Sequence, residues 1–163
     1  MSVAARPRPA LLLVVATVML GVLMAVLDAA IVNVAIPSIS GNLGATSDEA
    51  AWVATGYTLG MMIVMPLNGW LTARLGQKWY YLGAFGIFTV MSALCGAASG
   101  IWMLIAFRVL QGLGGGALQP IALSILLRSA PADRRGDMVA AFSFASVAPF
   151  ALCLLYTSPS PRD

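Results

Sequence analysis

Residues 79–127, WYYLGAFGIFTVMSALCGAASGIWMLIAFRVLQGLGGGALQPIALSILL, contain a single charged side chain, that of Arg108. A helix that crosses a bilayer needs about 20 mainly apolar residues, so this stretch is long enough for two such helices. The Ala-Ser-Gly turn at residues 98–100 falls where two antiparallel helices need a short link. The stretch therefore predicts membrane-spanning helices over residues 79–98 and 101–127.

The remainder of the chain is also strongly apolar. Of its 163 residues, 60% are hydrophobic and 9% are charged, whereas a soluble domain has about 25% charged residues. Uncharged runs predict further helices over about residues 10–37, 50–72 and 137–152. A single core of this size cannot hide so much apolar surface from water. We therefore predict an all-α membrane protein and exclude a soluble enzyme, a nucleic-acid binder and a disordered linker.

The residue types that commonly carry catalysis or bind metals are scarce. The chain has no histidine and only two cysteines, Cys95 and Cys153. This composition gives no support to a histidine-based active site, a metal site or a disulfide framework. We expect the protein not to be an enzyme, and we expect no cofactor and no metal.

Basic residues lie in alternate loops. The tail of residues 1–9, the loop at 73–78 and the loop at 128–136 together carry Arg6, Arg8, Arg74, Lys78, Arg128, Arg134 and Arg135. The loops at 38–49 and 98–100 carry no Lys or Arg. Since cytoplasmic loops are enriched in Lys and Arg, we predict a multi-pass protein of the plasma (inner) membrane with a cytoplasmic N-terminus. The net charge of +3 then reflects topology and indicates no nucleic-acid partner. A cleaved signal peptide is the alternative for the first segment, but its apolar run exceeds the usual length.

The last eleven residues, CLLYTSPSPRD at 153–163, differ from the rest in composition. They resemble the translation of a sequencing adapter, so we predict a non-native tail; a genuine short polar C-terminus is the alternative. The fifth helix would then keep fifteen natural residues, from Met138 to Leu152. At 1.5 Å per residue these reach about 22 Å, which is short of the hydrocarbon core. We expect the sequence to be a fragment.

Two charged residues lie inside predicted spans. A carboxylate at the position of Asp28 costs about 2.5–3.5 kcal/mol to insert, so it should face a polar cavity or a partner; a loosely wound helix end near water is the alternative. By helical periodicity Arg108 shares a polar face with Gln111, Gly112, Gly115 and Gln119.

The depths of these two charges match. Asp28 lies about 14 Å below a helix end near Pro37, and Arg108 lies about 10 Å below the same surface. We predict that both face one central cavity and couple directly or through water and Gln111. In addition, Gly112 and Gly116 have the spacing that permits close approach of another helix.

Three motifs in this order resemble those of the major facilitator superfamily, and specifically of its fourteen-helix drug:proton antiporter group. Residues 28–37, DAAIVNVAIP, resemble the first-helix motif, in which Asp28 precedes a run that includes Asn33. Residues 69–78 resemble the loop motif G-x-x-x-D-R-x-G-R-R/K, with Ala73 in place of the acidic residue and Gln77 in place of a basic one. The residues that match this loop motif are Gly69, Arg74, Gly76 and Lys78, and those that match the fourth-helix motif R-x-x-Q-G are Arg108, Gln111 and Gly112.

The resemblance implies a fold and a function. Residues 10–152 would form the N-terminal five helices of a transporter, an incomplete first six-helix half. The implied function is proton-coupled efflux of drugs or toxic compounds, with Asp28 and Arg108 as the proton-coupling residues and the motif at 69–78 as a gating loop. The implied partners are a drug-like small molecule, protons and the lipid bilayer, while a periplasmic adaptor protein stays unidentified. Another solute carrier of the same superfamily, such as a proton symporter, and a non-functional or structural membrane fragment are the alternatives.

Overall fold

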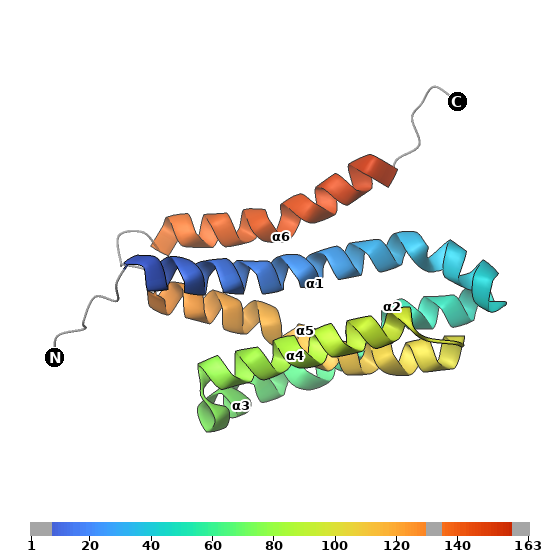
Figure 1. The fold of residues 1–163 in the computed structure, drawn as a ribbon, viewed down its shortest axis with the longest axis horizontal. Coiled ribbons are helices and arrows are strands. Elements are labelled where there is room, and N and C mark those ends of the chain that lie inside the picture. Colours follow the sequence, from blue (N-terminus) through green and yellow to red (C-terminus); the bar gives the residue numbers. More distant parts are fainter. Residues whose placement is uncertain (1–7, 130–134, 158–163) are drawn as a thin grey trace.

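The structure, a computed structural model, describes residues 8–129 and 135–157. Their elements in chain order are α1 (Arg8–Leu43), α2 (Ser47–Val64), η1 (Met65–Leu67), α3 (Asn68–Leu75), α4 (Gln77–Gly96), α5 (Ile101–Ser129) and α6 (Arg135–Thr157). The long helices run side by side, with α6 along one side of α1 and with α5 and α2 packed against α1 elsewhere (Figure 1). The predicted all-α architecture is confirmed for this part of the chain.

Four helical stretches are long and apolar enough to cross a membrane. Among the described residues they are Leu13–Val32, Ser47–Leu75, Gln77–Gly96 and Ile101–Ser129, which correspond to the first four predicted helices. The fifth predicted helix corresponds to α6, which has 23 residues rather than fifteen. It is longer because it begins at Arg135, before Met138, and because helical backbone continues through residues 153–157, into the segment that we predicted to be a non-native tail. Residues 158–163 lie outside the described residues.

The first helix does not end near Pro37 as predicted but continues to Leu43. A proline removes one backbone hydrogen bond, and membrane helices tolerate this loss when the neighbouring carbonyl finds another partner. The ribbon of α1 bends over its last turns (Figure 1). The helix ends instead at Gly44, whose φ of 60° is a left-handed conformation that glycine adopts without strain.

The second helix begins three residues before its predicted start because Thr46 caps it. The Thr46 hydroxyl accepts a hydrogen bond from the Glu49 backbone N–H at 3.3 Å. In return, the Glu49 carboxylate accepts one from the Thr46 backbone N–H at 2.9 Å. This reciprocal capping box satisfies two donors at the helix start, and its Thr-x-x-Glu signature is present in the sequence at residues 46–49.

The second span is broken at Pro66, where the 3-10 turn η1 separates α2 from α3. Asn68, the first residue of α3, joins this break to two other helices. Its amide nitrogen donates to the Gly116 carbonyl of α5 at 3.1 Å, and its amide oxygen accepts from the Tyr80 hydroxyl of α4 at 2.6 Å. The break is therefore fixed by side-chain hydrogen bonds.

Helix α5 is the central element, with contacts to α1, α2, α4 and α6. Its glycines allow the close approach to α2: a Cβ on Gly112 would overlap the Tyr57 carbonyl, and a Cβ on Gly116 would lie 2.8 Å from the Met61 Cα. The predicted role of Gly112 and Gly116 in close helix packing is thus confirmed. The facing helix α2 contributes Gly60, whose Cβ would overlap a carbonyl of α5.

The main apolar core lies between α1, α4 and α5. It consists of Val18, Val22, Ala25, Tyr80, Tyr81, Ala84, Phe88, Ala117, Leu118, Ile121 and Ala122. Large apolar side chains such as Met62 on α2 and Val90 on α4 remain exposed on the outside of the bundle. An apolar exterior of this kind suits contact with lipid rather than water.

Candidate functional site

The centre of the candidate site is an ion pair between α1 and α5. Arg108 Nη1 donates to Asp28 Oδ2 at 2.7 Å, and the side chains of Arg108 and Asp28 are 7% and 13% exposed. The two side chains are therefore close enough to interact directly, which is one of the two arrangements that the sequence predicts. Asp28 lies in the interior of α1, so the alternative of a loosely wound helix end near water is wrong.

Gln111 completes the surroundings of the carboxylate. Its side chain is fully buried, and Nε2 donates to Asp28 Oδ1 at 3.0 Å. The Cys95 thiol of α4 lies 3.7 Å from the Gln111 amide oxygen, to which it donates a weak hydrogen bond. Both oxygens of Asp28 are therefore engaged, and the polar contacts link α1, α4 and α5.

Tyr57 of α2 closes the site from another side. The guanidinium carbon of Arg108 lies 6.0 Å from the centre of the Tyr57 ring, at the outer limit for a cation–π interaction. Arg108 Nε is buried and has no hydrogen-bond partner among the described residues. The Tyr57 hydroxyl lies against Gly115, where a Cβ would overlap it. Tyr57 could not be identified from the sequence, because a tyrosine inside an apolar span carries no distinguishing signal.

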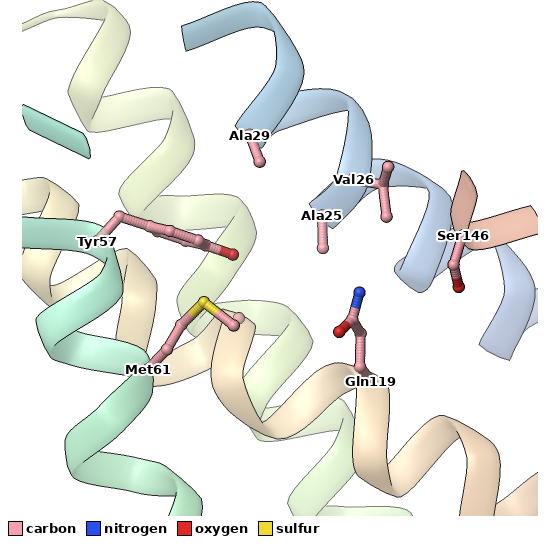
Figure 2. A pocket seen from close by; sticks show the side chains of 8 residues that line it. Ala25, Val26, Ala29, Tyr57, Met61, Gln119 and Ser146 are labelled. Carbon is pink, nitrogen blue, oxygen red and sulfur yellow. The ribbon is translucent and has the colours of Figure 1, made fainter. Parts of the chain in front are cut away.

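A pocket of about 190 Å³ lies beside the ion pair, between α1, α2, α5 and α6. Figure 2 shows its side chains converging from these helices. It is lined by Ala25, Val26 and Ala29 of α1, Tyr57 and Met61 of α2, Gly115 and Gln119 of α5, and Ser146 of α6.

The ion pair itself does not line this pocket. Neither Asp28 nor Arg108 is among the lining residues of this pocket. The two side chains turn toward each other and bury their charges, and that both face one central cavity stays a prediction. The ring of Tyr57 faces the guanidinium of Arg108 at 6.0 Å, and Tyr57 also lines the pocket.

The polar stripe predicted on α5 is present and divides into two parts. Arg108 and Gln111 contact Asp28, whereas Gly115 and Gln119 line the pocket. Gly112 lies between these two parts and packs against the backbone of α2. Asn33 lies in α1 just beyond Asp28, and its side chain is outside the described residues.

The predicted gating loop is mostly helical. Gly69 and Arg74 belong to α3, and Lys78 lies in the first turn of α4. Gly76 alone forms the turn between these helices, with a φ of 78° that favours glycine.

The two cations of this segment, Arg74 and Lys78, each lie over a tryptophan. The distances to the ring centres are 5.0 Å for Arg74 over Trp70 and 5.8 Å for Lys78 over Trp79. Within residues 8–129 and 135–157, neither cation forms an ion pair and no cluster of metal-ligating side chains is present.

Comparison with known proteins gives consistent results. The profile of the Major Facilitator Superfamily matches residues 18–157. Multidrug export protein EmrB of Haemophilus influenzae is 40% identical over 138 residues, which cover 85% of this chain and 27% of that protein. Multidrug resistance protein 3 of Bacillus subtilis is 41% identical over 129 residues, covering 79% of the chain and 25% of that protein. Fatty acid resistance protein FarB of Neisseria gonorrhoeae is 40% identical over 116 residues, which cover 71% of this chain and 23% of that protein.

The chain spans about a quarter of the length of these curated relatives. Their names, which refer to multidrug export and resistance, confirm the predicted resemblance to the drug antiporter group. The family match also confirms two predictions, namely a multi-pass membrane protein and membership of a family of transporters rather than of enzymes. With the helices, the ion pair and the matched profile in agreement, we conclude that the chain belongs to the major facilitator superfamily.

Proposed function

We propose that the chain is the N-terminal part of a proton-coupled efflux transporter for drugs or other toxic organic compounds. The observation that carries the proposal is the carboxylate of Asp28, held inside an apolar bundle by Arg108 and Gln111 and next to a pocket. Ionisable groups inside membrane spans commonly mark ion or substrate pathways. The names of the relatives add support for drug-like substrates.

The geometry suggests how a proton could be coupled to movement. When Asp28 is ionised, Arg108 and Gln111 hold α1 against α5. A proton on Asp28 would cancel the charge attraction, so the two helices would lose their strongest polar link. Protonation would thereby shift the balance between two arrangements of α1 and α5. Because the pocket is also lined by α1 and α5, the same shift would change its shape.

The test uses the full-length transporter encoded by the complete reading frame. We expect Asp28→Asn to abolish drug export driven by a proton gradient in everted vesicles, with membrane insertion retained. Asp48→Asn is the matched control, because Asp48 is exposed at the start of α2, and it should leave export unchanged. Undiminished export by Asp28→Asn would reject Asp28 as the coupling residue. Gradient-driven transport in the opposite direction would favour a symporter.

We further propose that the protein lies in the plasma membrane with its N-terminus and the segment of residues 69–78 in the cytoplasm. Arg74 and Lys78 support this orientation, because basic residues are enriched on the cytoplasmic side. A single cysteine in place of Lys78, in a background without Cys95 and Cys153, should react with a membrane-impermeant thiol reagent only after the cells are opened. Labelling of intact cells would overturn this orientation.

We also propose that the transporter portion is residues 10–152 and that residues 153–163 are not native. The change from an apolar helix to a Ser- and Pro-rich sequence supports this division. Resequencing the locus tests it: a genomic read that still encodes residues 153–163 would show that the tail is genuine. The same read would give the missing helices. A periplasmic adaptor is a further proposed partner, to be sought by cross-linking the full-length protein in cells.

A further inference from the structure

We infer that the pocket between α1, α2, α5 and α6 binds uncharged, ring-sized compounds that carry a hydrogen-bonding group, with Tyr57 and Gln119 as the residues that select them. The inference rests on the proposed function in one respect, namely that the pocket belongs to the transport path. It narrows the substrate class from drug-like compounds in general to drug-like compounds that are uncharged when they occupy this pocket.

Among the described residues, those that line the pocket include none with a charged side chain. The charges of Asp28 and Arg108, which lie on two of the helices that line the pocket, are already paired with each other at 2.7 Å. Gln111 occupies the second oxygen of the carboxylate. A cation or an anion in the pocket would therefore lose its hydration without gaining a free counter-charge, which is strongly unfavourable.

Two polar side chains of the lining have unused hydrogen-bonding capacity. In the part of the chain that the structure describes, neither the Tyr57 hydroxyl nor the Gln119 amide has a hydrogen-bond partner. The hydroxyl of Ser146, by contrast, already donates to the Phe142 carbonyl of its own helix at 2.9 Å. Figure 2 shows the Tyr57 and Gln119 side chains directed into the pocket from α2 and α5.

Each of these two groups can recognise a hydrogen-bonding group on a ligand. The Tyr57 hydroxyl can donate or accept, and the Gln119 amide supplies both donors and an acceptor. A polar group without a partner in an apolar environment is costly, so a ligand that satisfies both groups gains binding free energy. An isosteric ligand without such a group would leave them unpaired.

The remaining lining defines the size and the apolar character of the occupant. Ala25, Val26 and Met61 form its walls, and the thioether of Met61 adapts readily to different ring shapes. An engineered apolar cavity of about 150 Å³ holds benzene. The volume of about 190 Å³ is accordingly suited to a compound of one or two rings.

The experiment measures equilibrium binding of four probes of nearly equal shape to the full-length transporter in nanodiscs, with protein-free nanodiscs as the blank. The probes are 1-naphthol, which is uncharged and has a hydroxyl; 1-methylnaphthalene, which has no hydrogen-bonding group; N-methylquinolinium, a permanent cation; and 1-naphthoate, an anion. We expect 1-naphthol to bind most tightly and the two charged probes to bind most weakly.

Three variants test the assigned residues. Tyr57→Phe and Gln119→Leu should each weaken binding of 1-naphthol about three- to tenfold, the effect of losing one neutral hydrogen bond, and should not weaken binding of 1-methylnaphthalene. Thr58→Val is the matched control, because the exposed Thr58 hydroxyl donates to the Ala54 carbonyl of its own helix. It should leave the binding of all four probes unchanged.

Each outcome bears on the inference separately from the proposed function. Binding of the cation or the anion as tightly as 1-naphthol would overturn it, as would an unchanged preference for 1-naphthol in both Tyr57→Phe and Gln119→Leu. A transporter that exports drugs with a proton gradient but shows no preference for 1-naphthol would contradict only the inference. A protein that binds 1-naphthol with the expected preference but exports no compound would contradict only the proposed function.

Discussion

The buried ion pair makes a quantitative prediction about the coupling of Asp28 and Arg108. Their contact is 2.7 Å long and both side chains are at least 87% buried, at 13% and 7% exposure. With charge centres about 4 Å apart and an effective dielectric constant of about 20, their attraction amounts to about 4 kcal/mol. Removal of one partner leaves the other charge buried without compensation, which costs about 3–5 kcal/mol.

The perturbation is a double-mutant cycle of Asp28→Asn and Arg108→Met in the full-length transporter. Each single variant should lower the free energy of unfolding by about 3–5 kcal/mol. The double variant should lose no more than the worse single variant, so the coupling energy should be at least the smaller single loss, about 3 kcal/mol. The assay is reversible unfolding in bicelles, with transport measured in parallel.

The control for this cycle replaces a different arginine. Arg74 is exposed and lies over Trp70, with no hydrogen bond to the ion pair. Arg74→Met should therefore be additive with Asp28→Asn. Additivity within about 0.5 kcal/mol in the Asp28 and Arg108 cycle as well would refute the reasoning, because residues in contact should not behave as independent sites.

Three further predictions concern helix packing and the loop motif. Gly112→Ala should lower the free energy of unfolding by about 1–3 kcal/mol, because its Cβ would overlap the Tyr57 carbonyl. Gly86→Ala places its Cβ in open space, so it should be neutral or slightly stabilising. Equal losses of unfolding free energy in Gly112→Ala and Gly86→Ala would contradict the packing argument. Asn68→Leu should cost about 1–3 kcal/mol through its two lost hydrogen bonds, and a loss within the error of the same unfolding assay would show that they contribute nothing. Ala73→Asp should change the initial transport rate only modestly, because the natural protein lacks this carboxylate; an inactive variant would show that the segment depends on Ala73.

The helices could be predicted from the sequence because charged residues are so rare that each one marks a boundary or a site. Asp28 and Arg108 were identifiable for this reason, since a charge within an apolar span requires an explanation. Their contact was predicted from antiparallel helices with similar depths, although the depth of Asp28 was counted from a helix end near Pro37 and α1 ends at Leu43. Arg108 and Gln111 lie on one helical face by simple periodicity, and the structure places both against Asp28.

The helix ends were less predictable because local and tertiary effects compete there. Pro37 is a strong stop signal in a soluble helix, yet α1 passes through it and ends at Gly44. Pro66, in contrast, does interrupt its span. At Pro66 the interruption is accompanied by tertiary contacts, because Asn68, two residues later, binds α4 and α5, and no local pattern reveals those partners.

Tyr57, which closes the site from α2, was not predicted because tyrosine is a common residue in membrane proteins. Tyrosines occur throughout membrane proteins as apolar or interfacial residues. What distinguishes Tyr57 is its position opposite Gly112 and Gly115, two glycines of a different helix. Such a relation needs the register between α2 and α5, which a single sequence does not contain.

Helix packing, the ion pair and the pocket meet at Tyr57, so they do not vary independently. Its carbonyl lies against Gly112, its ring faces Arg108, and its hydroxyl lies against Gly115 at the edge of the pocket. A compound that displaces the Tyr57 ring from the pocket would therefore change the surroundings of the Arg108 guanidinium. Conversely, a proton on Asp28 would free Arg108 to move toward or away from that ring. A change in the distance between α2 and α5 would alter both the ring of Tyr57 opposite Arg108 and the Tyr57 hydroxyl at the edge of the pocket. The pocket and the Asp28 carboxylate can therefore influence each other through Tyr57 and Arg108, although they do not touch.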